Sequence, residues 1–401
     1  MKILQINIFG NLSTGRIAVD LYRSLKKDGH DGIVAFARNN IAEDVAHIRI
    51  GNKLSVYVDG VLTRITDKAG FYSRRATKKL IEQIENYNPD IIHLHNLHGY
   101  YINIELLFNY LRECGKPVVW TLHDCWAFTG HCCYFSVAEC NKWKIGCFKC
   151  PQLYSYPKSV LVDNSKYNYE KKKEIFTSLS NLHLVCVSKW LESKVKESFL
   201  KDIPCEVIYN GIDTEVFKPT YSQLRDKYGI LNKKIVLAVS TSWSDKRKGL
   251  EDILQLASCS DDKFVVIIVG LTEKEKKSIP EGIVAITRTD STKELAELYS
   301  MADFFFNASV EETFGLPTVE AMACGPPVIV YNMTALPEVV SKQNGFVVEK
   351  HDINTVKKIV LEEWNYNREN ISDSVVPYSK EIMMKKYLST YSRIVGETDR
   401  W

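Results

Sequence analysis

Short apolar runs alternate with helical patterns along the first half of the chain. The runs KILQINIF, DGIVAFA, DIIHLH and PVVWTLH are separated by helical patterns over residues 15–27, 78–87 and 104–114. Strands that alternate with helices of about ten residues favour parallel pairing through helical crossovers, and a parallel sheet needs helices on both faces. This half predicts a doubly wound α/β domain, which the runs LHLVCVS and CEVIYNG extend to about residue 210.

A second cycle of the same pattern follows Pro219 and the polar stretch TYSQLRDKYG. Its apolar runs are KKIVLAVST, KFVVIIVG, GIVAITR, DFFFNAS and PPVIVYN. We expect two Rossmann-like domains, over residues 1–207 and 208–375, and a C-terminal helical segment over 376–401 that packs back on the N-terminal domain. Ligands of such sheets bind beyond the carboxyl ends of the strands, which places the expected site in a central cleft that both domains face.

Composition narrows the class of protein. Hydrophobic residues make up 45% and charged residues 25% of the 401 residues, which excludes disordered, collagen-like and coiled-coil proteins. The 52 Lys and Arg and 49 Asp and Glu leave a net charge of +3, too even a balance for a nucleic-acid binder. No apolar run reaches the roughly 18 residues of a membrane span, and MKILQINIFG has no signal-peptide features, so we expect a cytoplasmic protein.

The stretch SVEETFGLPTVEAMACG, residues 309–325, carries the strongest chemical signal. Gly315 occupies a turn, and Pro317 stands where a helix would begin. The free amides of such a helix N-terminus favour an anion, and Glu320 in the first turn would accept hydrogen bonds from sugar hydroxyls. The alternative is that Glu320 only complements the helix dipole and that Glu312 is a solvated loop carboxylate.

The same stretch carries a family resemblance. Residues Glu312–Gly325 resemble the signature of family 4 retaining glycosyltransferases, which have the GT-B fold. The segments IYNGIDTEVFKP, KG at residues 248–249, ALPEVV and NGFVV match in the same order, and the match covers nearly the whole chain. TLHDCWAFTG and HLHNLHGYY are similar to segments of the transferases of colanic acid and O-antigen assembly.

The resemblance implies roles in the C-terminal domain. Glu312 would lie beside the donor sugar, Glu320 would bind the nucleotide ribose, and Lys248 would stabilise the departing diphosphate. The other residues assigned to donor binding are Phe314, Gly315 and Leu316, whose amides would face the diphosphate, and Arg247 and Arg288. Arg247 would replace the arginine of a strand-end GR pair usual in the family, where Ser242 or Trp243 stands here; a solvated KRK turn is the alternative.

In the N-terminal domain the resemblance implies that His123 touches the donor sugar and that Asp124 is a base for the acceptor hydroxyl. A structural hydrogen-bonding role is the alternative for His123. Thr14 and Gly15 follow the first strand, where a glycine permits close approach to the donor diphosphate; a tight turn capped by Thr14 explains the same residues.

The acceptor side is assigned to Asn96, His98, Tyr100 and Tyr101. His93, His95 and His98 also suggest a metal site, but no carboxylate or cysteine accompanies them in the sequence. GT-B enzymes need no metal for their chemistry, so the resemblance implies that catalysis requires no cofactor.

Five of the eleven cysteines fall within residues 132–150. Cys133, Cys140, Cys147 and Cys150 end in a CxxC knuckle and predict a structural zinc site, with His131 and Cys132 as spare ligands. Reduced buried cysteines or disulfides are the alternatives. The loop would hold a lid over the acceptor site.

These features predict a retaining glycosyltransferase that moves a sugar from a UDP- or GDP-sugar to a saccharide acceptor, lipid-linked, in the synthesis of O-antigen, capsule or exopolysaccharide. A nucleotide-sugar 2-epimerase and a non-catalytic nucleotide-sugar-binding subunit are the rival interpretations. Arg64, Arg74, Arg75, Lys78 and Lys79 form either a patch for anionic lipid, at the inner face of the cytoplasmic membrane, or a solvated helix face.

Overall fold

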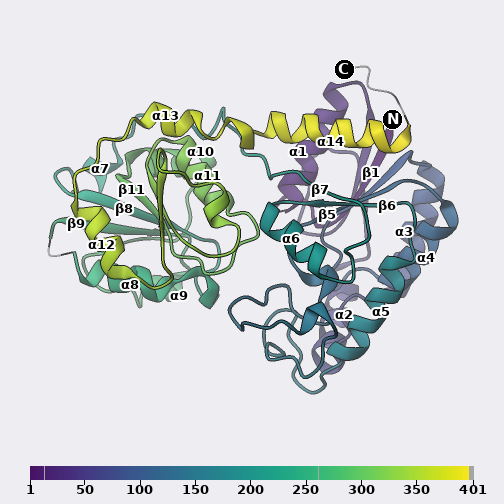
Figure 1. The fold of residues 1–401 in the computed structure, drawn as a ribbon. Coiled ribbons are helices and arrows are strands. Elements are labelled where there is room, and N and C mark those ends of the chain that lie inside the picture. Colours follow the sequence, from purple (N-terminus) through teal and green to yellow (C-terminus); the bar gives the residue numbers. More distant parts are fainter. Residues whose placement is uncertain (13, 261, 397–401) are drawn as a thin grey trace. The chain divides into compact units, whose positions relative to one another are not determined.

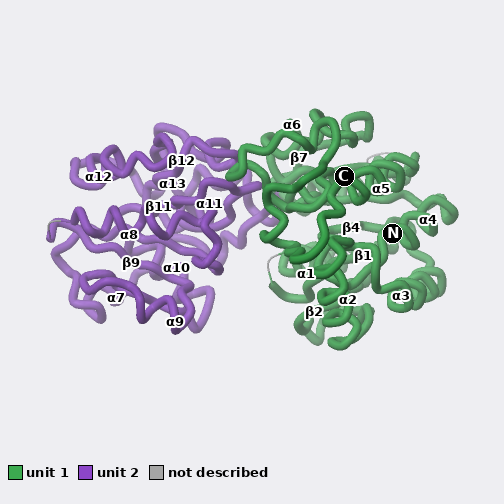
Figure 2. The backbone as a smooth tube through the Cα atoms, turned by 90° about the horizontal axis from the view of Figure 1, so that it is seen from below, with its two compact units in different colours: residues 1–209, 383–401 green, residues 210–382 purple. Residues whose placement is uncertain are grey.

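The computed structural model describes residues 1–12, 14–260 and 262–396 (Figure 1). The chain divides into two compact units, which Figure 2 colours separately. Unit 1 consists of residues 1–209 together with the segment from residue 383 onward, and unit 2 consists of residues 210–382. Each unit is an α/β domain with one parallel sheet, as the alternation of apolar runs and helices predicts.

Unit 1 contains a seven-stranded sheet in the order β3-β2-β1-β4-β5-β6-β7, and all pairings are parallel. The strands are β1 (Lys2–Phe9), β2 (Asp31–Arg38), β3 (His47–Arg49), β4 (Ile91–Leu94), β5 (Val118–Leu122), β6 (Leu182–Cys186) and β7 (Cys205–Val207). Its helices are α1 (Thr14–Lys27), α2 (Lys53–Thr66), α3 (Arg74–Tyr87), α4 (Ile104–Cys114), α5 (Ser165–Thr177) and α6 (Lys189–Glu197), with short 3-10 turns η1 (Trp126–Phe128) and η2 (Lys142–Lys144). Every residue of β4 and β5 is buried, which explains why these strands read as continuous apolar runs.

Unit 2 contains a six-stranded parallel sheet in the order β10-β9-β8-β11-β12-β13. The strands are β8 (Lys234–Val239), β9 (Phe264–Val269), β10 (Val284–Ile286), β11 (Phe304–Asn307), β12 (Val328–Tyr331) and β13 (Gly345–Val348). The helices are α7 (Leu224–Lys227), α8 (Leu250–Ser258), α9 (Glu273–Lys276), α10 (Thr292–Met301), α11 (Leu316–Ala323), α12 (Ile353–Leu361) and α13 (Arg368–Asp373), and the 3-10 turns are η3 (Lys246–Lys248), η4 (Leu336–Glu338) and η5 (Val376–Tyr378).

The last helix, α14 (Lys380–Val395), packs against the sheet of unit 1 from Met383 onward. Tyr387 and Tyr391 are fully buried, and their hydroxyls hydrogen-bond Thr121 at 2.9 Å and His93 at 2.6 Å. Residues 376–382, which the sequence groups with this helix, lie instead in unit 2. Among the described residues, no helix is long and apolar enough to cross a membrane.

The strand order places a topological switch point in each sheet. In unit 1 the connection direction reverses between β1 and β4, and in unit 2 it reverses between β8 and β11. Loops that follow adjacent strands on opposite sides of a switch point diverge and leave a crevice for a ligand. The loops that follow these four strands, together with the loop that follows β5, carry the residues of the candidate site.

Candidate active site

In unit 2, the loops after β8 and β11 are joined by an ion pair. Lys248 Nζ lies 2.5 Å from Glu312 Oε1, and the two side chains are only 20% and 16% exposed. The Glu312 amide donates to Thr334 Oγ1 at 2.9 Å, and the Glu312 carbonyl accepts from the Ala335 amide. Glu312 is thus a fixed, largely buried carboxylate, and its interpretation as a solvated loop residue is wrong.

Two glycines allow these loops to run close to their neighbours. Gly249 has φ 69°, and a Cβ there would lie 2.1 Å from the carbonyl oxygen of Ala308. Gly315 has φ 91°, and a Cβ there would lie 2.6 Å from Leu336 Cδ2. Gly315 is the N-cap of α11 and has no side-chain cap, so this N-terminus presents backbone to its surroundings. Phe314, Gly315 and Leu316 therefore surround a helix start as the sequence predicts, with a proline inside the first turn.

Glu320 lies deeper in α11 than the sequence predicts. The helix begins at Leu316 and has no acidic residue in its first turn, so the prediction of a first-turn carboxylate is wrong. The side chain is 6% exposed, and Tyr299 donates a 3.5 Å hydrogen bond to its Oε2. Because the helix dipole acts mainly within the first turn, the dipole does not account for a buried carboxylate at this depth.

Arg247 is engaged within unit 2. Its guanidinium contacts Asp245 Oδ2 at 2.5 Å and the carbonyl oxygen of Glu311 at 3.3 Å, and the side chain is 16% exposed. The interpretation of KRK as a solvated turn is therefore wrong for Arg247 and Lys248. Arg288 is not brought together with them: it is exposed and follows β10, two strands away from β8.

In unit 1, the loop after β1 leads into α1 through Thr14 and Gly15. The Thr14 hydroxyl donates to Asn7 Oδ1 at 3.1 Å, and Thr14 is itself the first residue of α1. A Cβ on Gly15 would lie 2.6 Å from the carbonyl oxygen of Phe9, so only glycine fits here. The close approach of the helix start to β1 is thus built into the sequence.

Three histidines form a buried row: His93 of β4, His95 just beyond the end of β4, and His123 after β5. His95 Nδ1 lies 3.2 Å from His123 Nε2, and His95 Nε2 lies 3.1 Å from Gln5 Oε1. His93 uses both ring nitrogens, for Tyr391 and Thr121. Burial lowers the pKa of His93 to about 3 and that of His123 to about 4, and it holds the pKa of His95 well below its usual range. These rings are neutral hydrogen-bonding groups, which accounts for His93 and His95 without a metal.

Asp124 and His98 form a second buried group next to this row. Asp124 Oδ2 lies 2.6 Å from His98 Nε2, and Asp124 Oδ1 accepts from the Trp126 amide at 2.9 Å. Burial alone would raise the pKa of Asp124, but His98 and the Trp126 amide outweigh it and lower that pKa. Within the described part of the chain, one group of three ligand-type atoms lies within 4.8 Å of one another, and it consists of His98, Asp124 and Cys133.

The acceptor-side residues differ in how far they are accessible. Tyr101 is 1% exposed, and its hydroxyl donates to the Asn96 carbonyl at 2.7 Å, so the predicted contact of Tyr101 with an acceptor is wrong. Tyr100 is 8% exposed, and burial raises its pKa to about 12. Tyr156, which the sequence did not single out, contacts His98 Nδ1 through its hydroxyl at 3.0 Å.

Lys172 is a second residue that sequence reasoning missed. It lies on α5, is 1% exposed, and donates to the carbonyl oxygens of Trp126 at 2.8 Å and Thr129 at 3.1 Å. Burial lowers its pKa to about 7. A lysine in an otherwise polar helix sequence carries no signal that distinguishes it from a surface residue.

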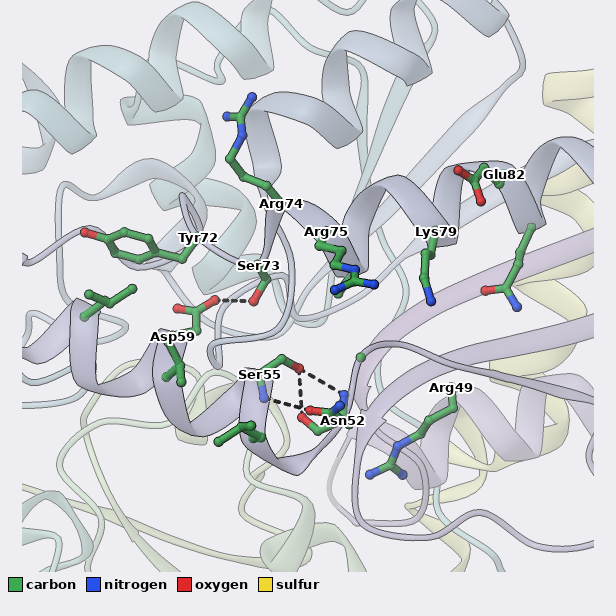
Figure 3. A pocket seen from close by; sticks show the side chains of 16 residues that line it. Arg49, Asn52, Ser55, Asp59, Tyr72, Ser73, Arg74, Arg75, Lys79 and Glu82 are labelled. Carbon is green, nitrogen blue, oxygen red and sulfur yellow. Dashed lines mark hydrogen bonds between the residues drawn. The ribbon is translucent and has the colours of Figure 1, made fainter.

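The residues of the predicted basic patch do not all lie on one surface feature. Arg74, Arg75 and Lys79 of α3, together with Arg49, line a groove of about 980 Å³ between α2 and α3, whereas Arg64 and Lys78 do not line it (Figure 3). Figure 3 shows Arg75 and Lys79 pointing from α3 into the space above Asn52, while Arg74 points away. Leu54 and Val58 of α2, which also line the groove, are 69% and 46% exposed.

Two family models match the chain, one over most of unit 1 and one within unit 2. The model described as Glycosyltransferase Family 4 matches residues 14–216, and the model described as Glycosyl transferases group 1 matches residues 221–369. Two doubly wound parallel sheets, each matched by a glycosyltransferase family model, define a glycosyltransferase of the GT-B class. The predicted fold and enzyme class are therefore confirmed. The Glycosyltransferase Family 4 model alone matches half of the chain, so the protein belongs to glycosyltransferase family 4.

Individual relatives agree with this assignment. The colanic acid biosynthesis glycosyl transferase WcaC of Escherichia coli is 24% identical over 98% of this chain and 100% of its own length. Among solved structures, a glycosyltransferase from Rickettsia africae has a TM-score of 0.70 at 18% identity, with 99% of each chain covered. Anabaena HepE in complex with UDP and glucose has a TM-score of 0.67 at 16% identity, covering 98% of this chain and 99% of its own. These comparisons give no support to the epimerase interpretation.

Proposed function

We propose that the protein transfers a sugar, with retention of configuration, from a nucleoside-diphosphate sugar to a hydroxyl of a saccharide acceptor in the assembly of a cell-surface polysaccharide. The Lys248–Glu312 pair beside the uncapped start of α11 carries this proposal. Support for the donor class comes from HepE, solved with UDP and with UDP-glucose. Support for the process comes from relatives named for colanic acid, O-antigen and capsular polysaccharide biosynthesis.

The donor half of the reaction is assigned to unit 2. When the glycosidic bond to the diphosphate breaks, negative charge collects on the phosphate oxygens, and a fixed cation aimed at that charge lowers the barrier. Lys248 is this cation, and the amides at the start of α11 add a favourable dipole. Glu312 holds Lys248 in place before the donor binds and then lies beside the donor sugar. Glu320 accepts hydrogen bonds from the ribose.

The acceptor half is assigned to unit 1. His123, neutral because of its burial, offers a hydrogen bond to a sugar hydroxyl without adding a charge. Asp124 is a weak base, since its carboxylate already accepts from His98 and from the Trp126 amide. We assign Asp124 and His98 to orienting the acceptor hydroxyl, whose proton passes to an oxygen of the departing diphosphate.

The acceptor is proposed to be lipid-linked and presented at an anionic membrane. Arg75 and Lys79 in the groove between α2 and α3 supply positive charge beside the exposed Leu54 and Val58, the combination that binds a lipid headgroup. Co-sedimentation with phosphatidylglycerol vesicles should fall at least fivefold in the double variant Arg75→Glu/Lys79→Glu. Equal binding by this variant and by a control with Lys166→Glu and Lys171→Glu on α5 would remove the groove from the proposal.

A donor panel tests the function itself. The protein is incubated with UDP- and GDP-sugars, and binding is scored as a rise in melting temperature, since a ligand of the folded state stabilises it. The donor that binds is then incubated alone and with saccharide acceptors. We expect a new glycoside only in the presence of acceptor. An epimerised sugar from donor alone would establish the epimerase instead, and binding without any product would favour the non-catalytic subunit.

A further inference from the structure

Four cysteines line one small cavity in the segment that follows η1. The cavity has a volume of about 10 Å³, enough for a single ion or water molecule, and its lining includes Cys132, Cys140, Cys147 and Cys150. All eleven cysteines of the chain lie within the described residues, and none of them forms a disulfide there. The neighbouring Cys133 does not line the cavity and faces His98 and Asp124 instead.

Two contacts join members of this group, although among the described residues no three of these four sulfurs lie within 4.8 Å of one another. The thiols of Cys132 and Cys150 hydrogen-bond each other. The amide of Gly130 donates to Cys147 Sγ at 3.2 Å. Cys147 and Cys150 belong to a CxxC pair, which presents two sulfurs to one tetrahedral ion.

The segment that carries these cysteines contains little regular secondary structure. Between η1 and α5, residues 129–164 contain η2 as their one regular element among the described residues. Loops longer than about 15 residues without secondary structure are uncommon in compact domains. This loop also exposes large apolar side chains, with Ile145 89% and Tyr154 71% exposed, so burial of apolar surface holds it only in part.

The surrounding charges favour an anionic centre. Zn²⁺ with four thiolates has a net charge of −2, and a buried charge of that size needs nearby cations. The side chain of Lys172 is buried against the neutral carbonyl oxygens of Trp126 and Thr129, and the thiols whose charge would act on it are Cys133, Cys147 and Cys132. An ammonium at this position and a negative cluster stabilise each other.

We propose that Cys132, Cys140, Cys147 and Cys150 bind one structural Zn²⁺ ion. The four thiols rotate toward the cavity and lose four protons to solvent, and each sulfur reaches the metal at about 2.3 Å. This set replaces Cys133 of the sequence-based set by Cys132. Because four thiolates close the coordination sphere, the ion stabilises the loop and keeps Tyr156 in place against His98.

Metal analysis of the full chain, purified without chelator and under reducing conditions, tests the proposal. We expect close to one zinc per chain, and intense visible absorption typical of tetrahedral thiolate ligation when Co²⁺ replaces it. Cys147→Ser and Cys132→Ser should each lose most of the zinc, whereas Cys133→Ala and the distant Cys259→Ser should retain it.

Two further measurements keep the proposal testable if the ligand variants fail to fold. In wild-type protein, four thiols should be protected from alkylation before a chelator is added. A chromogenic chelator should then remove the zinc, and the four thiols should become reactive. Less than one zinc per ten chains, combined with either four alkylated thiols or a mass four daltons below the reduced chain, would overturn the proposal in favour of reduced cysteines or disulfides. Loss of zinc from Cys133→Ala but not from Cys132→Ser would overturn the ligand set.

Discussion

Lys248 and Glu312 meet at 2.5 Å although 64 positions separate them in the chain, and their contact joins the loops that follow β8 and β11. The pair places one cation and one carboxylate at the switch point of the unit 2 sheet. In the proposed function, a diphosphate would compete with Glu312 for the Lys248 ammonium, and a sugar would then reach the Glu312 carboxylate.

Replacing Lys248 by methionine should weaken binding of a nucleoside diphosphate by about tenfold or more, because a charge-assisted contact to phosphate is lost. The turnover number should fall further, by about a hundredfold, since the charge on the phosphate grows as the bond breaks. Isothermal titration with UDP and GDP and steady-state kinetics measure the two effects. Lys246→Met in the same turn, with an exposed side chain, is the matched control and should behave as wild type.

Gly249→Ala should destabilise unit 2 by about 3 kcal/mol, because the backbone has φ 69° and the new methyl group would lie 2.1 Å from the Ala308 carbonyl oxygen. Gly282→Ala is the control: its φ is 88° but no atom lies within 4 Å of the added carbon, so it should cost only the backbone strain of about 1 kcal/mol. Urea unfolding of both variants measures the difference. Equal losses of stability in the two variants would show that the backbone after η3 moves aside without cost.

Unit 1 should lose stability between about pH 6.5 and pH 3. The pKa of His93 is about 3 and that of His123 is about 4 in the folded protein, below the ordinary value of 6.5, so the unfolded chain binds protons first as the pH falls. Above pH 6.5 the neutral rings make their full contribution to the free energy of unfolding. By pH 5 the contribution of each ring has fallen by about 2 kcal/mol.

Urea midpoints at pH 7 and pH 5, followed by a probe in unit 1, measure this loss. His93→Gln should reduce the pH dependence, because one titrating group is gone, whereas the exposed His47→Gln should leave it unchanged. A midpoint that does not move in wild type over this range would contradict the burial of the histidine row.

Tyr391→Phe should destabilise unit 1 by about 1 to 3 kcal/mol, because it leaves the buried His93 Nδ1 without its 2.6 Å partner. Tyr391→Ala should cost about 3 to 5 kcal/mol through the added cavity. Denaturation curves measure both losses. Tyr221→Ala, at a side chain that is 84% exposed, should change the stability little.

The sequence predicts the alternating fold well because strands buried on both faces appear as unbroken apolar runs. It misses α2, whose exposed Leu54, Tyr57 and Val58 disturb the expected helical pattern, and it misses the three-residue edge strand β3. Local residues also fix the start of α11, where Gly315 and a proline determine the turn.

Contacts between distant segments explain what the sequence does not show. The pairing of Lys248 with Glu312 and of His98 with Tyr156 depends on tertiary packing that no local pattern encodes. The adjacent Cys132 and Cys133 differ for a simpler reason. Consecutive residues of a non-helical backbone point to different sides, and only the structure shows which of the two lines the cavity.

The most direct measurement follows transfer by wild type and by Glu312→Gln with the donor that the panel identifies, using NMR to read the anomeric configuration of the product. Wild type should give a product with the donor's configuration and release nucleoside diphosphate only when acceptor is present. Glu312→Gln should lose at least about a hundredfold in rate while donor affinity changes less than threefold. Undiminished transfer by Glu312→Gln, or a product of inverted configuration, would contradict the account.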